Sequence, residues 1–151
     1  MKKVLIPFSG GLDSTYLVWK NLVEGNNVTV VYFELENNSE KTRLEKISRE
    51  KTYDILKEEY GERLNKSYFS YKIHLNNIQN DFSLAQPPIW ILGCFFSCNE
   101  FFDEIQLAYV MNDDVVSFIK DIEVLYKAYE PFSNRPLPLL SFPLLKDKKE
   151  H

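Results

Sequence analysis

The segment 8–15, with the sequence FSGGLDST, joins two apolar runs, VLI at 4–6 and YLVW at 16–19. This order predicts a strand, a tight loop and a helix. The adjacent glycines let the backbone turn sharply and approach a ligand closely. Hydroxyl groups of the segment and free N–H groups of the first helical turn would then face one concavity, where the helix dipole favours an anion. The segment therefore predicts a phosphate-binding loop.

An acidic residue separates this loop from the common nucleotide loop G-x-x-x-x-G-K-[ST]. That loop has a lysine directly before its hydroxyl residue, whereas here Asp13 precedes Ser14. A carboxylate among phosphates repels them unless a cation lies between, so Asp13 predicts Mg²⁺. The alternative is a glycine-rich turn in which Asp13 or Ser14 only caps the helix.

The rest of the chain alternates between strand and helix patterns. Right-handed crossovers turn this alternation into a parallel sheet, so we predict an α/β fold of three Rossmann-like layers with a five-stranded, mainly parallel sheet. In such sheets ligands bind at the carboxyl ends of the strands, where 9–14, 33–37 and 111–114 would line one crevice. We expect strands at 3–8, 28–33, 68–75, 104–110 and 139–142, and helices at 13–24, 39–60, 89–102 and from Asp113 or Asp114 to 129.

Composition limits the function classes. The 151 residues are enough for one domain, 1–151, with a buried core. The formal charge is −4 without a long basic run, so nucleic acid is not an expected partner. The sequence has no apolar stretch of membrane-spanning length and no signal-peptide pattern, and we expect a cytoplasmic protein.

Two helix patterns carry further expectations. In the helix at 39–60, Leu44, Ile47, Ile55 and Leu56 form the expected apolar stripe. The segment 88–102 is apolar enough to be core or a homodimer face. Its Cys94 and Cys98 favour buried small hydrophobes over redox chemistry. No zinc site is expected, because the chain has two cysteines and one internal histidine.

The sequence SGGLDS at 9–14 resembles the S-G-G-x-D-S signature of the N-type PP-loop ATP pyrophosphatases. The resemblance implies an adenine nucleotide alpha hydrolase-like fold in which the loop holds the pyrophosphate of ATP and AMP is joined to a substrate oxygen. The order of segments, with YVMNDD at 109–114 and LSFPLLK at 140–146, is most similar to 7-cyano-7-deazaguanine synthase of queuosine biosynthesis and its phage and defence-system relatives. Those enzymes activate a carboxylic acid with ATP and convert it with ammonia to an amide and then a nitrile.

The chain departs from that pattern at several points. It lacks the C-terminal zinc-binding cysteines and looks shortened at its C-terminus. Trp90 and Ile91 stand where the synthases usually have Arg-Asn, and Asn112 stands where they have glycine. Nucleotide binding is therefore better supported by the resemblance than nitrile synthesis.

The resemblance also implies roles for individual residues. Asp13 and Ser14 would act in the reaction, and Asp13 would hold Mg²⁺ with Asp113 or Asp114 as a second acidic partner, unless these two cap a helix. Tyr32 and Phe33 would flank the adenine, with ordinary core as the alternative. The nucleotide-binding residues would be Ser9, Gly10, Gly11, Leu12, Asp13, Ser14, Thr15, Tyr32 and Phe33.

Three functions remain open at this point. The first is an AMP-forming ligase with ATP and Mg²⁺ that acts on a small carboxylate or deazapurine, chiefly by positioning and charge stabilisation. The second is a nucleotide-binding module that has lost its chemistry, such as a sensor or a phage-borne binding or decoy protein. The third is an RNA thiolation enzyme, which would need reactive cysteines.

Overall fold

A computed structural model describes residues 1–35, 40–71 and 86–145. Within these ranges five strands form one sheet in the order β3-β2-β1-β4-β5, and every neighbouring pair is parallel. The strands are β1 (Lys3–Pro7), β2 (Asn27–Leu35), β3 (Leu64–Tyr71), β4 (Glu104–Gln106) and β5 (Leu139–Ser141). The α-helices are α1 (Leu12–Val23), α2 (Glu40–Tyr60), α3 (Gln86–Ser97) and α4 (Ile119–Lys127). Short 3-10 helices are η1 (Gly61–Arg63), η3 (Asp114–Phe118) and η4 (Glu130–Phe132).

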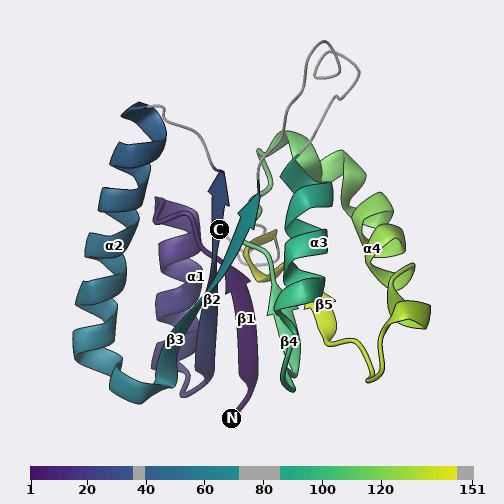
Figure 1. Cartoon of the computed structure of the whole chain (residues 1–151), viewed down its shortest axis with the longest axis horizontal. Coiled ribbons are helices and arrows are strands. Elements are labelled where there is room, and N and C mark those ends of the chain that lie inside the picture. Colours follow the sequence, from purple (N-terminus) through teal and green to yellow (C-terminus); the bar gives the residue numbers. More distant parts are fainter. Residues whose placement is uncertain (36–39, 72–85, 146–151) are drawn as a thin grey trace.

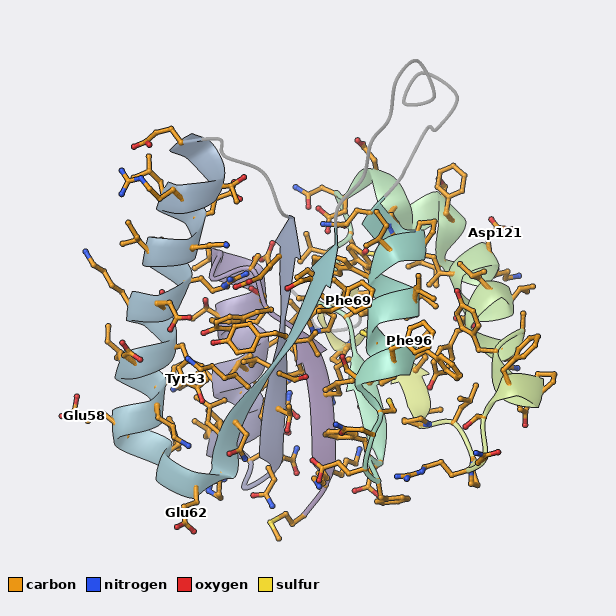
Figure 2. All side chains as sticks on the ribbon, viewed as in Figure 1. Tyr53, Glu58, Glu62, Phe69, Phe96 and Asp121 are labelled. Carbon is orange, nitrogen blue, oxygen red and sulfur yellow. The ribbon has the colours of Figure 1, made fainter. Side chains whose placement is uncertain are left out.

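The helices cover both faces of the sheet (Figure 1). On one face α1 packs on β1 and β2, and α2 packs on β3; on the other, α3 packs on β1, β2 and β3 and is flanked by α4. Alternate residues of β1 and β2 therefore enter two separate cores. Tyr53 points from α2 toward the sheet, while Phe69 lies on the side of α3 (Figure 2). The three-layer α/β prediction is confirmed.

The two central strands have the pattern of a sheet covered on both faces. Val30, Val31 and Tyr32 are fully buried although they point to opposite sides. Pro7 has no N–H and stands at the last position of β1, where it removes no interior ladder bond. The next residue still donates its N–H to Val31 O at 2.9 Å, which leads the chain into the loop.

The outer strands differ in length from the prediction. β3 starts at Leu64 instead of 68, because it pairs with β2 from Val28 to Leu35. It lies at the sheet edge as expected, and the predicted continuation to residue 75 lies outside the described residues. β4 ends at Gln106 instead of 110, since its neighbour β5 is only three residues long between Pro138 and Pro143.

The helices on the second face also shift. α3 begins three residues before the expected start, with Pro87 and Pro88 in its first turn, where their missing N–H groups cost nothing. It buries Ile91 and Cys94 against the sheet, so this part of the apolar segment is core, while Phe96 is exposed. The single helix expected from Asp113 or Asp114 to 129 is divided into η3 and α4, and η4 follows it.

A chain of polar side chains joins β4 to α1 near the amino ends of the strands. Glu104 accepts hydrogen bonds from Lys2, Gln106 and Ser141. The amide of Gln106 accepts in turn from Asn21 at 2.7 Å, and Asn21 accepts from Asn26 at 2.9 Å. Glu104, Gln106, Asn21 and Asn26 are buried yet paired, so they tie the sheet to its helix layer.

No helix in the described parts of the chain combines the length and apolar character needed to cross a membrane.

Candidate functional site

The glycine-rich loop lies at the switch in strand order. It leaves the carboxyl end of β1, whose neighbours β2 and β4 are reached by connections that run to opposite sides. Crevices at such points are the usual ligand sites of open α/β sheets. The predicted loop therefore stands at the predicted position, between β1 and α1 (Figure 1).

Two serine hydroxyls hold the loop together. Ser9 N donates to Ser14 Oγ at 3.3 Å, and the two hydroxyl oxygens are 3.0 Å apart. Gly11 N donates to Ser9 Oγ at 3.2 Å. Ser14 is buried, whereas Ser9 is exposed. The hydroxyl of Ser14 therefore supports the loop from the protein interior, and that of Ser9 lies on the solvent side.

The two glycines have different tasks. Gly10 has a φ of +80°, and a Cβ there would lie 2.8 Å from Cα of Arg49, so only glycine lets α2 approach the loop. Gly11 is the N-cap of α1 and offers no side chain to its first turn. The N–H groups that a capping side chain would take therefore receive no side-chain bond.

A cavity of about 350 Å³ opens beside the loop. Asp13 lies on its loop side, and Asp113 and Asp114 lie on the other. Three acidic residues thus line one cavity, and among the described residues its lining includes no Lys, Arg or His. The lining residues are Ser9, Gly11, Leu12, Asp13, Ser14, Gln86, Pro87, Trp90, Ala108, Tyr109, Asp113, Asp114 and Val115.

Asp113 has a structural partner of its own. Its Oδ2 accepts the N–H of Val110 at 2.7 Å, which closes the turn after β4. It also occupies the N-cap position of η3, although its side chain makes no capping bond there. The described residues contain no cluster of three or more His, Cys, Asp or Glu with metal-binding proximity. A divalent cation would therefore rely on Asp13 and on ligand oxygens, with Asp113 or Asp114 on the far side.

A second cavity of about 370 Å³ lies between the end of β2 and α2. Ser9, Gln86 and Trp90 belong to both linings, so the two cavities meet at the loop. The remaining lining residues are Phe8, Phe33, Glu34, Thr42, Glu45, Lys46 and Arg49.

A row of stacked aromatic rings connects the linings of the two cavities. Phe33 stacks on Trp90 with ring centres 5.6 Å apart, and Trp90 stacks on Tyr109 at 5.9 Å. Phe142 continues the row at 6.4 Å from Tyr109. Such a wall of nearly parallel rings suits a flat aromatic ligand.

The predicted nucleotide-binding residues do not all face this crevice. Phe33 lines the second cavity, whereas Tyr32 points to the opposite face of the sheet and is fully buried, which makes its ring core. Burial, followed by the charge of Glu50, raises the pKa of the Tyr32 hydroxyl. Gly10 and Thr15 line neither cavity, although both belong to the loop region.

Sequence patterns missed the contribution of α2. The expected apolar stripe is wrong for Leu44, Ile47 and Ile55, which are 53%, 41% and 68% exposed. The buried face instead carries Arg49, Tyr53 and Leu56 at helical spacing. The spacing of Arg49 from Tyr53 and Leu56 could have indicated this face, but a cation is not an expected core residue.

Neither cysteine has the surroundings of a reactive thiol. Cys94 is fully buried, and burial raises its pKa well above the ordinary value. Cys98 donates its S–H to Cys94 O at 3.2 Å, and burial raises its pKa to about 11. Both therefore remain neutral thiols at physiological pH, as expected for buried small residues.

Comparisons with known proteins give a fold and no family. No family model matches the sequence, and no curated protein matches it. One similar solved structure is the predicted subunit of tRNA methyltransferase from Methanocaldococcus jannaschii, with a TM-score of 0.57 and 14% identity. The match covers 96% of this chain and 69% of that one. At this identity the likeness supports the Rossmann-like α/β fold alone.

Proposed function

We propose that this protein binds ATP with its pyrophosphate end in the loop 9–14 and transfers AMP to a small carboxylate, in the manner of the PP-loop enzymes that its loop resembles. The observation that carries the proposal is the uncapped start of α1 at a strand-order switch, where two cavities meet at Ser9. One cavity can hold the nucleoside and the other the acid.

The reaction needs little proton transfer from the protein. A carboxylate oxygen attacks the α-phosphorus, the bond between the α-phosphorus and the bridging oxygen breaks, and pyrophosphate leaves with the electron pair. N–H groups at the start of α1 would stabilise the leaving charge. Asp13 would hold Mg²⁺, which neutralises phosphate charge in such sites.

The test is an incubation with ATP, Mg²⁺ and a panel of small carboxylic acids, with pyrophosphate and AMP measured. Release that depends on an added acid is expected for the wild type, and Asp13→Ala should abolish it. Asp121→Ala is the matched control, because Asp121 is exposed on α4 and points away from the sheet (Figure 2). Acid-independent release, or equal release by Asp13→Ala, would contradict the proposal.

A second candidate is a nucleotide-binding module without turnover. The observation that favours it is the first cavity, where the described part of the lining has three acidic residues and no basic side chain to stabilise charge on a transferring phosphoryl group. ATP would then raise the melting temperature without any release of pyrophosphate. A ligand at 100 times its Kd adds about 2.7 kcal/mol to the free energy of unfolding. If millimolar ATP gives no shift, both candidates are wrong.

The raised pKa values of both thiols speak against RNA thiolation, which needs a thiolate.

A further inference from the structure

The second cavity contains a fixed carboxylate next to the aromatic wall. Glu34 follows Phe33 at the carboxyl end of β2, the strand beside the one that carries the loop. Its Oε1 accepts from Arg49 Nη2 at 3.2 Å, and its Oε2 lies 3.8 Å from Lys46 Nζ. These two cations hold the side chain of Glu34. It is still 23% exposed and belongs to the lining of the cavity.

Arg49 is the group that fixes this carboxylate. Its side chain is only 8% exposed, and its guanidinium stacks on the ring of Tyr32 at 3.9 Å. Its Nε is buried without a hydrogen-bond partner, so Nη2 is the nitrogen that holds Glu34. The backbone of Arg49 packs directly against Gly10, where a Cβ would lie 2.8 Å from Cα of Arg49. The position of Glu34 is therefore tied to that of the phosphate loop.

The charges of the cavity decide what kind of group fits. Among the described lining residues, Glu34 and Glu45 contribute two negative charges, and Lys46 and Arg49 contribute two positive charges. A second anion would have to displace Glu34 from its cations, whereas a neutral hydroxyl needs only a free acceptor. A carboxylate has about four lone-pair sites, and the two cations leave some of them open. The cavity thus favours a ligand that offers neutral hydroxyl groups to Glu34 and a flat aromatic ring to the aromatic wall.

We propose that Glu34 is the specificity-determining acceptor for the ribose hydroxyls of the bound nucleotide, with Arg49 as its positioning residue. The inference rests on the proposed function, because the loop must hold the phosphates for the nucleoside to enter this cavity. In doubly wound folds an acidic residue about 20 residues beyond the phosphate loop commonly accepts a ribose hydroxyl bond. Glu34 stands at a comparable distance after Ser14 and at the end of the corresponding second strand.

The experiment compares the binding of ATP, 2′-deoxy-ATP, 3′-deoxy-ATP and inorganic triphosphate by calorimetry. The wild type should bind ATP about tenfold more tightly than at least one deoxy analogue, since a hydrogen bond to a charged acceptor is worth about one decade or more. Glu34→Gln should reduce this ratio to about threefold or less and leave triphosphate binding unchanged. Glu58→Gln is the matched control, because Glu58 points into solvent at the far end of α2 (Figure 2).

A second variant separates recognition from folding. Glu34→Asp keeps a negative charge for Arg49 but draws it back by one methylene, so the ratio should fall while the melting temperature changes little. Equal affinity of the wild type for ATP and both deoxy analogues overturns the inference and leaves the proposed function intact. An unchanged ratio in both Glu34 variants also overturns it. If neither ATP nor triphosphate binds, the loop assignment itself is wrong, and the inference falls with it.

Discussion

The two ends of the parallel strands, called here the amino edge and the carboxyl edge of the sheet, differ in how their buried polar groups are paired. At the amino edge, Glu104 has three donors, and the chain of bonds continues through Gln106 to Asn21. Around the loop at the carboxyl edge, the described residues include three buried side-chain atoms without a partner. These atoms are Thr15 Oγ1, the Tyr32 hydroxyl oxygen and Arg49 Nε.

This difference separates folding from binding. A buried polar atom without a partner costs about 1–3 kcal/mol, so paired groups hold the fold and unpaired groups weaken it. None of the predicted site residues lies at the amino edge, and the polar groups of that edge stabilise the strand order. The carboxyl edge keeps uncapped N–H groups at the start of α1 and, in the second cavity, an arginine whose Nε has no partner. Substitutions at the two edges should therefore change different measurements.

Gly10→Ala should have the largest effect on stability. Alanine is strained at a φ of +80°, and its Cβ would lie 2.8 Å from the backbone of Arg49. Strain and overpacking together should cost about 2–4 kcal/mol, which lowers the melting temperature by roughly 10 °C for a domain of this size. Thermal unfolding by circular dichroism measures the shift.

Gly25→Ala is the control for Gly10→Ala. Gly25 has a φ of +91°, but a Cβ there would meet nothing within 4 Å, so only the backbone strain remains. Equal losses in the two variants would show that α2 does not press against the loop.

Glu104→Ala should cost about 2–3 kcal/mol, because Gln106 and Ser141 lose their acceptor inside the protein. Urea unfolding gives the free energy of unfolding, and nucleotide affinity should not change. Glu100→Ala is the matched control at an exposed ion pair with Lys3, where the expected loss is below about 0.5 kcal/mol. A similar loss of unfolding free energy in both variants would mean that the hydrogen bonds of Glu104 do not stabilise the amino edge.

The same carboxylate predicts a pH dependence. Burial alone would raise the pKa of Glu104, but hydrogen bonds from Ser141, Gln106 and Lys2 outweigh it and hold the pKa below its usual 4.5. A lowered pKa in the folded state means that stability is full above pH 4.5 and is lost as the pH falls through the folded value. Urea midpoints between pH 6 and pH 3 should therefore fall more steeply for the wild type than for Glu104→Gln.

Local patterns were enough to predict the loop side of this comparison. In the segment from β1 through the loop into α1, the predicted bounds of the helix agree with the observed ones within one residue at either end. The reason is that the strand, the glycines and the apolar helix follow one another directly in the sequence. The carboxyl ends of β1 and β4 also met at one cavity, since parallel pairing leaves them no other arrangement.

Long-range contacts decided what the patterns missed. Arg49 is buried because Tyr32 and Glu34, on another element, offer it a ring and a carboxylate. Three of the four apolar residues of the predicted stripe of α2 remain exposed as a result. The length of β4 likewise depends on β5, a partner that follows it by more than 30 residues. Periodicity within one helix or strand contains none of this information.

Thr15→Val should have the smallest effect and is the sharpest test of the carboxyl edge. Thr15 Oγ1 is buried without a partner and lines neither cavity, so a methyl group in its place should leave the free energy of unfolding unchanged or raise it by up to about 1 kcal/mol. Ser14→Ala is its neighbour for comparison, because Ser14 Oγ bonds both the N–H and the hydroxyl of Ser9. That variant should lose about 1 kcal/mol and weaken ATP binding as the loop loosens. If Thr15→Val instead weakens ATP binding as much as Ser14→Ala does, the hydroxyl of Thr15 must turn toward the phosphates when the nucleotide binds, and the unpaired atom belongs to the ligand.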